Sequence, residues 1–114
     1  CCDLRKVEPN ARALSPLDAW ITGIRRDQAG TRSEIGIVEW NEKFSLVKVN
    51  PVAHWGKKEI WDYILAAKIP YNPLLDQGYK SIGCTYCTVV VGANGNDRDG
   101  RWPGMDKAEC GLHT

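Results

Sequence analysis

The clearest hydrophobic periodicity runs from Lys57 to Lys68, in the stretch KKEIWDYILAAK. Apolar side chains recur there at the i, i+3, i+4 and i+7 spacing of an amphipathic helix, at Ile60, Tyr63, Ile64 and Ala67. Pro70 follows, and proline cannot continue a helix. The pattern predicts a helix over residues 57–68 that packs along this face. We expect three of its side chains to lie in the core: Trp61, Ile64 and Leu65.

Shorter apolar runs predict strands. The run LDAWITGI (17–24) follows Pro16 and predicts a buried strand, and IGIVEW (35–40) and FSLVKVN (44–50) predict a hairpin joined by residues 41–43. Apolar residues in 1–14 have helical spacing that Pro9 interrupts, which predicts a helix or two short turns. The polar or Pro- and Gly-rich segments 25–34 and 69–83 are predicted loops. Mixed helices and strands indicate an α/β fold.

Composition and charge exclude several classes of function. With 43% hydrophobic and 25% charged residues, the 114-residue chain is typical of one soluble globular domain. No apolar run approaches the roughly 18 residues of a membrane span, and the net charge of +1 gives no case for nucleic-acid binding. Because the chain opens on Cys1 rather than methionine, we expect a fragment that lacks its N-terminal part.

The basic residues are unevenly placed. Arg25, Arg26 and Arg32 fall in one short stretch, and Arg98 and Arg101 in another. Such patches suit a small anionic ligand better than a long polyanion, although solvated loop charges are an equal alternative.

The five cysteines divide into four plus one: Cys1, Cys2, Cys84, Cys87 and Cys110. The odd number argues against a secreted disulfide scaffold and favours a reducing, cytoplasmic compartment. The CxxC of Cys84 and Cys87 is compatible with a redox pair, but a second pair at positions 1 and 2 favours metal ligation. Adjacent cysteines fit one zinc tetrahedron poorly, so the spacing favours an iron–sulfur cluster and leaves zinc open.

Seven stretches resemble, in consistent order, the C-terminal half of assimilatory adenylyl-sulfate reductases, the iron–sulfur branch of the sulfonucleotide reductase family. They are CCDLRKVEP, DAWITGIRRDQAGTR, KVNP, PYNPL, QGYKSIGCTYCT, DRDGRW and KAECGLH. The resemblance implies that residues 1–114 are the C-terminal part of an adenine nucleotide alpha-hydrolase-like (PP-loop) fold. Residues 98–114 would form a mobile tail that contacts substrate and carries the nucleophile.

The resemblance also implies an activity: thioredoxin-dependent reduction of adenosine 5′-phosphosulfate (APS) to sulfite and AMP in sulfate assimilation, through an S-sulfocysteine. The donor would be thioredoxin or a glutaredoxin-like dithiol. The implied nucleophile is Cys110, and Lys6 would lie near a 4Fe–4S cluster held by Cys1, Cys2, Cys84 and Cys87. Arg98 and Arg101 match substrate contacts, and the further candidates are Arg25, Arg26, Arg32 and His113.

Several alternatives stay open. The substrate could be the 3′-phosphorylated nucleotide, PAPS, or both nucleotides. A non-catalytic zinc or iron–sulfur scaffold would not need Cys110, and a redox relay would use Cys84 and Cys87 as a disulfide. The family's Gly/Ser-rich pyrophosphate loop is not in this chain, so we expect the chain to be inactive by itself. The sequence leaves homo-oligomerisation open.

Overall fold

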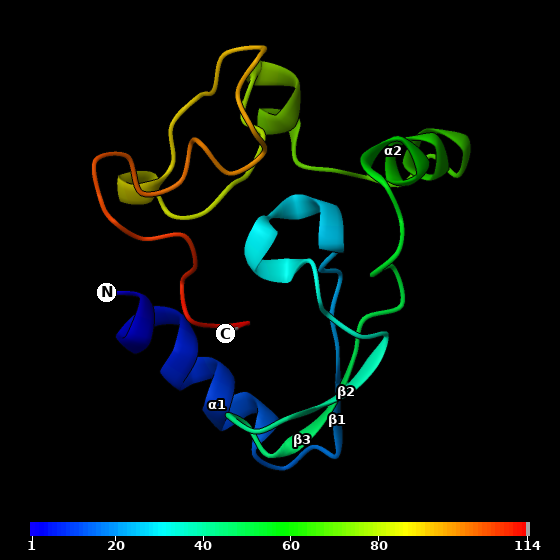
Figure 1. The fold of residues 1–114 in the computed structure, drawn as a ribbon, viewed down its shortest axis with the longest axis vertical. Coiled ribbons are helices and arrows are strands. Elements are labelled where there is room, and N and C mark those ends of the chain that lie inside the picture. Colours follow the sequence, from blue (N-terminus) through cyan, green and yellow to red (C-terminus); the bar gives the residue numbers. More distant parts are fainter. Residues whose placement is uncertain (114) are drawn as a thin grey trace.

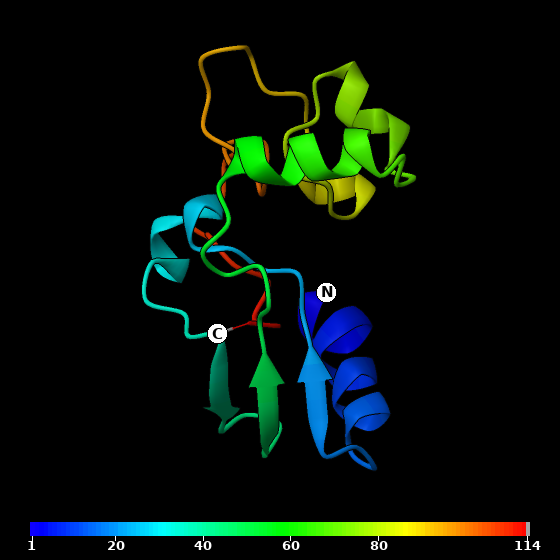
Figure 2. The same cartoon turned by 90° about the vertical axis from the view of Figure 1, so that its right-hand side faces the viewer.

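The structure is a computed structural model that describes residues 1–113. A small three-stranded sheet forms the centre of the N-terminal part of the fold (Figures 1 and 2). The strands are β1 (Ala19–Ile21), β2 (Val38–Asn41) and β3 (Leu46–Val49), in the order β1-β3-β2. β1 runs parallel to β3, and β2 runs antiparallel to it. The antiparallel pair confirms the predicted hairpin, with shorter strands than the apolar runs suggest.

Two α-helices accompany the sheet, α1 (Glu8–Leu14) and α2 (Lys57–Ala66). A π-helical turn, η1 (Asp3–Val7), leads into α1, and Pro9 stands in the first turn of α1, where its missing N–H costs nothing. Helical structure over residues 1–14 is thereby confirmed. α2 ends before the predicted Lys68, which adopts a left-handed φ of 52°.

Short 3₁₀ turns lie in the two segments predicted as loops and in the CxxC motif. They are η2 (Arg26–Gln28), η3 (Gly30–Arg32), η4 (Pro73–Gln77) and η5 (Thr85–Cys87). Gln28 joins the first two, because its Oε1 accepts from Arg32 Nη1 at 2.7 Å and from the Arg25 backbone N–H at 3.1 Å. These turns matter for function, since they carry arginines and cysteines that the sequence identifies as candidates.

The two faces of the sheet have different surroundings. α1 and the C-terminal end of the chain lie on the same side of the sheet (Figures 1 and 2). On the opposite side, Ile21, Val38 and Trp40 have 73%, 65% and 56% of their surface exposed. The prediction that 17–24 is a buried strand is therefore wrong for one of its two faces, because successive side chains alternate between faces and only one is covered.

α2 also packs along a narrower stripe than predicted. Ile60, Trp61 and Ile64 line a cavity, whereas Tyr63 and Leu65 are 55% and 63% exposed. In Figure 2 the helix crosses the end of the molecule far from the sheet, so turns rather than strands form its neighbours. The core position predicted for Leu65 is therefore wrong, and Trp61 and Ile64 are half-buried at the cavity rather than in the core.

The architecture is mixed α/β, as predicted. Its buried apolar residues are few, and they include Leu14, Ile24, Leu46, Ala53 and Trp102. Within residues 1–113, none of the helices has the length and apolar character that crossing a membrane requires.

Candidate active site

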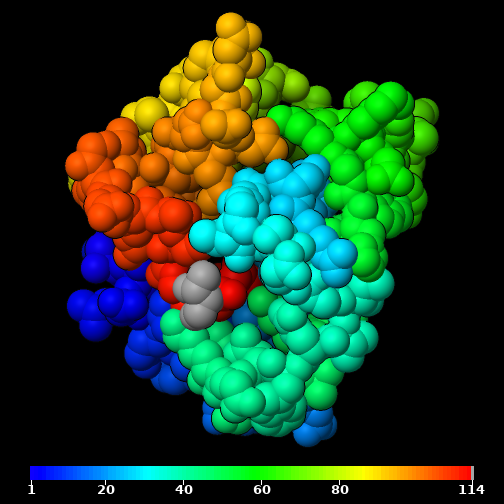
Figure 3. Space-filling view, viewed as in Figure 1, coloured from blue at the N-terminus to red at the C-terminus, as the bar shows by residue number. Residues whose placement is uncertain are grey.

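The terminal segment, residues 107–113, is packed into the molecule (Figure 3). In the space-filling view the red C-terminal residues lie between the blue N-terminal segment and the cyan η2–η3 turns. Cys110 lies half-buried within this segment. The sequence predicts a mobile tail; in this structure the tail has specific contacts on both sides of Cys110, and its movement stays a prediction.

Glu109, directly before Cys110, makes the most extensive of these contacts. Its Oε1 accepts from Arg32 Nε at 2.8 Å and from Thr31 Oγ1 at 3.2 Å. Its Oε2 accepts from Arg32 Nη2 at 2.9 Å and from Arg98 Nη2 at 3.1 Å. Burial raises the pKa of Glu109, but hydrogen bonds and positive charge from Arg32 and Arg98 outweigh it, so the pKa lies below its usual value. The carboxylate is therefore ionised at neutral pH.

On the other side of Cys110, the chain is held against the sheet. The Lys43 ammonium donates to the carbonyl oxygen of Gly111. The His113 ring stacks on Trp20, with ring centroids 5.2 Å apart and planes inclined by 9°. Burial, together with the charges of Lys48 and Arg32, lowers the pKa of His113 to about 4. His113 is therefore a neutral, half-buried ring at pH 7.

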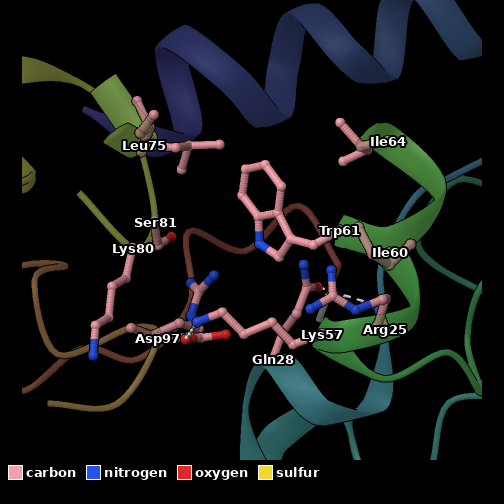
Figure 4. Close-up of a pocket in the computed structure, with 12 residues that line it drawn as sticks. Arg25, Gln28, Lys57, Ile60, Trp61, Ile64, Leu75, Lys80, Ser81 and Asp97 are labelled. Carbon is pink, nitrogen blue, oxygen red and sulfur yellow. Dashed lines mark hydrogen bonds and ion pairs between the residues drawn. The ribbon is translucent and has the colours of Figure 1, made fainter. Parts of the chain in front are cut away.

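A cavity of about 340 Å³ opens beside this arrangement (Figure 4). We call it the cationic groove, because its charged lining residues are Arg25, Lys57, Lys80, Arg98 and a single acid, Asp97. Asp97 is paired with Lys57 at 2.5 Å, so net positive charge remains. The Trp61 indole projects into the cavity among Ile60, Ile64 and Leu75 (Figure 4). The groove thus offers donors for an anion and a flat apolar wall.

The five arginines predicted to bind substrate lie in four places. Arg25 and Arg98 line the cationic groove, and Arg32 holds Glu109. Arg26 lines a neighbouring cavity and donates from Nε to the Ile35 carbonyl oxygen at 2.8 Å. The fifth, Arg101, lies against the CxxC turn.

The CxxC turn brings two thiols together. The sulfurs of Cys84 and Cys87 are 3.0 Å apart on η5. Arg101 donates from Nη1 to Ser81 Oγ at 3.2 Å, and its Nη2 lies 3.9 Å from the Cys87 sulfur. A Cβ at Gly83 would lie 2.3 Å from that Nη2, so glycine leaves room for the guanidinium. Burial raises the pKa of Cys87, but the Cys84 hydrogen bonds and Arg101 bring it down to about 7.

The donor set for a cluster is only partly assembled. Cys84 and Cys87 supply paired thiols with a favourable neighbouring charge. Cys1 is exposed and Cys2 half-buried at the N-terminal end, which lies beside the η5 region in both ribbon views. Lys6 is half-buried in η1. Among residues 1–113, no three or more His, Cys, Asp or Glu side chains come together as a metal-binding group.

Sequence reasoning missed several residues of this region. Glu109 stands next to Cys110 in the KAECGLH stretch, but its partners Thr31 and Arg32 lie more than 75 positions away, so no local pattern reveals its contacts. Lys48 gives a usable signal: it alternates in phase with Leu46 in LVKV, and both are almost fully buried. Trp20, which stacks on His113, has no comparable signal.

Comparisons with known proteins show which proteins this chain resembles. Residues 1–90 match the family described as phosphoadenosine phosphosulfate reductase domain. The chain is 51% identical, over its whole length, to a phosphoadenosine 5′-phosphosulfate reductase of Gloeobacter violaceus, and 50% identical to an adenosine 5′-phosphosulfate reductase of Salinibacter ruber. It covers 48% and 46% of those proteins, so it spans about half the length of the curated relatives that it matches.

Solved structures show a similar fold. A phosphoadenylyl-sulfate reductase from Candida auris matches 76% of this chain and 41% of its own, with a TM-score of 0.66 and 39% identity. An FMN adenylyltransferase from Candida glabrata matches 90% of this chain and 40% of its own, with a TM-score of 0.60 and 16% identity, which shows the fold alone. These likenesses confirm the predicted PP-loop nucleotide alpha-hydrolase-like fold.

Proposed function

The chain belongs to the phosphoadenosine phosphosulfate reductase domain family, and from this premise we propose that it takes part in reducing adenosine 5′-phosphosulfate to sulfite and AMP in sulfate assimilation. One observation carries the proposal: the segment with Cys110 is held by Arg32 and Arg98, and Arg98 also lines the cationic groove. This contact supports a site in which a nucleophilic thiol acts beside the cations that would receive an anionic substrate.

The first step is attack by the Cys110 thiolate on the sulfur of the phosphosulfate. A bond forms between the Cys110 sulfur and the sulfonate sulfur, and the bond from that sulfur to the bridging oxygen breaks. AMP leaves with the oxygen and its electron pair, and Cys110 carries a sulfonate. A thiolate suits this reaction because it is the reactive form of cysteine and a strong nucleophile.

Cations are required because both reactants are negative. Arg98 and Arg25 at the groove offer planar sets of donors that match phosphate and sulfate oxygens. Trp61 offers a ring face beside them for an apolar or flat part of the ligand. His113, neutral at pH 7, supports the terminal segment through Trp20 and adds no positive charge.

The second step needs a dithiol donor, thioredoxin or a glutaredoxin-like protein. One donor thiolate attacks the Cys110 sulfur, sulfite leaves with the electron pair of the S–S bond, and a mixed disulfide remains. The second donor thiol then displaces Cys110 as a thiolate, and the donor becomes oxidised. Two electrons are thus transferred from the donor to the sulfonate group.

Cys1, Cys2, Cys84 and Cys87 are the residues that would hold a 4Fe–4S cluster, and the adjacent thiols of the CxxC turn support that assignment. Such a cluster would supply a structural anchor and a local negative charge, near which Lys6 and Arg101 would be favourable. No step of the reaction passes through it.

The complete polypeptide with Cys110→Ser tests the proposal. With ³⁵S-labelled nucleotide and no donor, we expect label on wild-type Cys110 and none on the variant, and sulfite release should fall at least about 1000-fold. Iron content should be equal in both proteins. Sulfite release by the variant at the wild-type rate would refute the role of Cys110, and equal iron with no activity in either protein would favour a scaffold.

A second candidate substrate is PAPS, since two of the similar proteins are named as reductases of the 3′-phosphorylated nucleotide. Measurement of kcat/KM for both nucleotides, under the same donor, decides between the substrates. We expect the ratio to favour APS.

A further inference from the structure

We infer that Glu109 is a positioning residue: its carboxylate anchors the terminal segment to Arg32 and Arg98 and thereby sets the Cys110 thiol beside the cationic groove. The inference rests on the proposed function, because it names how the nucleophile of that reaction is held. It adds a role for a residue whose own chemistry the reaction does not need.

The contacts of Glu109 are those of a strong anchor. Both carboxylate oxygens accept two hydrogen bonds each, three from guanidinium groups and one from Thr31. The Arg32 contact is bidentate, and its two distances are 2.8 and 2.9 Å. Only 7% of the Glu109 side chain and 9% of the Arg32 side chain are exposed. A small movement of the terminal segment would therefore break these hydrogen bonds without letting water replace them on the Glu109 carboxylate, which makes the movement costly.

Arg98 links this anchor to the groove. Its Nη2 donates to Glu109 and also to the Ala108 carbonyl oxygen at 2.9 Å, so the two residues before Cys110 fix one edge of the guanidinium. Its Nε is buried and has no partner within residues 1–113. The Arg98 Nε–H therefore remains as a donor for an oxygen of the substrate. Cys110, the proposed nucleophile, directly follows Glu109 in the anchored segment.

The anchor does not cancel the positive charge of the site. Two guanidinium groups share one carboxylate, which leaves a net charge of +1 in the Arg32–Glu109–Arg98 cluster. An anionic nucleotide is therefore still attracted while the terminal segment is in place.

The other contacts of the segment are weaker candidates for this role. The Lys43 ammonium donates to the backbone carbonyl oxygen of Gly111, and this contact is exposed to solvent. His113 and Trp20 make a neutral ring contact. Among these contacts, only that of Glu109 combines burial, charge and a position next to Cys110 in the chain.

The test measures how well each cysteine is protected from iodoacetamide in the complete polypeptide, by peptide mass spectrometry. Glu109→Gln keeps the shape of the side chain and removes its charge, and we expect alkylation of Cys110 to rise at least about tenfold. Thr31→Ala removes one neutral donor and should raise it about two- to threefold. Asp106→Asn is the matched control, because Asp106 is an exposed carboxylate three residues before Glu109. This variant should leave the alkylation rate of Cys110 unchanged.

Cys87, which is 5% exposed, reports on the fold in the same samples. Its alkylation should stay at the wild-type rate in Glu109→Gln, since the anchor is local. If Cys87 becomes reactive together with Cys110, Glu109 stabilises the whole fold and the inference is overturned. Wild-type protection of Cys110 in Glu109→Gln overturns it equally.

A single-turnover reaction with labelled nucleotide separates this inference from the proposed function. Glu109→Gln should slow the transfer of label to Cys110 at least about tenfold. The decrease should match the rise in the alkylation rate of Cys110 in the same variant. If wild-type Cys110 never takes up label although the alkylation pattern is as expected, the anchor is supported and the proposed reaction is overturned.

Discussion

At the scale of single residues, the site is built from ionisable groups whose neighbours hold them in one protonation state. Lys48 is 1% exposed, and burial lowers its pKa while Glu39, at 3.6 Å, opposes that effect. The same ammonium lies 5.6 Å from the Trp20 ring centroid, and Trp20 stacks on His113. Protonation of His113 would therefore add a positive charge next to one that is already buried.

Acidification should loosen the terminal segment through His113. The groups that face it are Trp20, which is uncharged, the cations Lys48, Arg32 and Arg98, and the acid Glu109. Because the folded pKa of about 4 lies below the unfolded value near 6.5, the unfolded state binds more protons between those values, and stability falls as pH drops from 6.5 towards 4. At pH 5 the loss is about 2 kcal/mol at most.

Urea unfolding of the wild type and of His113→Phe between pH 7 and pH 5 measures this effect. The variant keeps an apolar ring against Trp20 and should lose less stability over this range. Equal losses in the two proteins would show that other groups cause the pH dependence.

At the scale of elements, the loop between the CxxC and Trp102 acts as a small hairpin. Val89 N–H donates to the Gly100 carbonyl oxygen at 2.8 Å, and Trp102 N–H donates to the Cys87 carbonyl oxygen at 3.0 Å. These bonds bring Arg101 back to the cysteines from which the sequence separates it by fourteen positions. The Trp102 indole, 3% exposed, lies under the Arg101 guanidinium at 4.5 Å from its centroid.

Gly100→Ala should disrupt this hairpin. A Cβ there would lie 2.3 Å from the Val89 carbonyl oxygen, and backbone atoms cannot move aside as a flexible side chain does. We expect a loss of about 1–3 kcal/mol in unfolding free energy and a lower iron content after anaerobic purification. Gly92→Ala, where a Cβ has open space, should leave both unchanged. Normal stability and iron in Gly100→Ala would contradict this account.

At the scale of the whole molecule, the uncovered face of the sheet is the largest departure from the expectation for a closed domain. Ala19, Val47 and Trp40 pair across the sheet in one row, and Ile21, Val49 and Val38 in the next. Such a contiguous apolar surface is unusual for an isolated soluble unit. It is compatible with the finding that the chain spans about half the length of the curated relatives that it matches.

The 114-residue chain should therefore bind an apolar dye and self-associate. Ile21→Lys with Trp40→Lys should reduce the fluorescence of bound dye several-fold and favour the monomer, because both side chains lie on the open face. Leu4→Lys is the control, since Leu4 is 78% exposed but lies in η1, outside the sheet. A similar decrease in dye fluorescence for Leu4→Lys would show that the dye-binding surface is not the open face of the sheet.

Features that depend on neighbouring residues could be predicted from the sequence. The 3.6-residue period placed α2, two short apolar runs joined by a polar turn placed the β2–β3 hairpin, and Pro9 marked the two-part helix at the start. The spacing of the cysteines favoured metal ligation, and the family resemblance implied the role of Cys110, which stays a prediction. Local backbone preferences and motifs are sufficient for such predictions, because they involve residues only a few positions apart.

Which distant groups meet depends on the packing of the folded chain. It placed Glu109 on Arg32, Arg101 on the CxxC turn and His113 on Trp20, and it left one face of the sheet uncovered. The exposure of Leu65 belongs here too, since residue type alone predicts the opposite. Packing of elements against each other fixes these outcomes, and neither periodicity nor spacing along the chain encodes which surfaces will face each other.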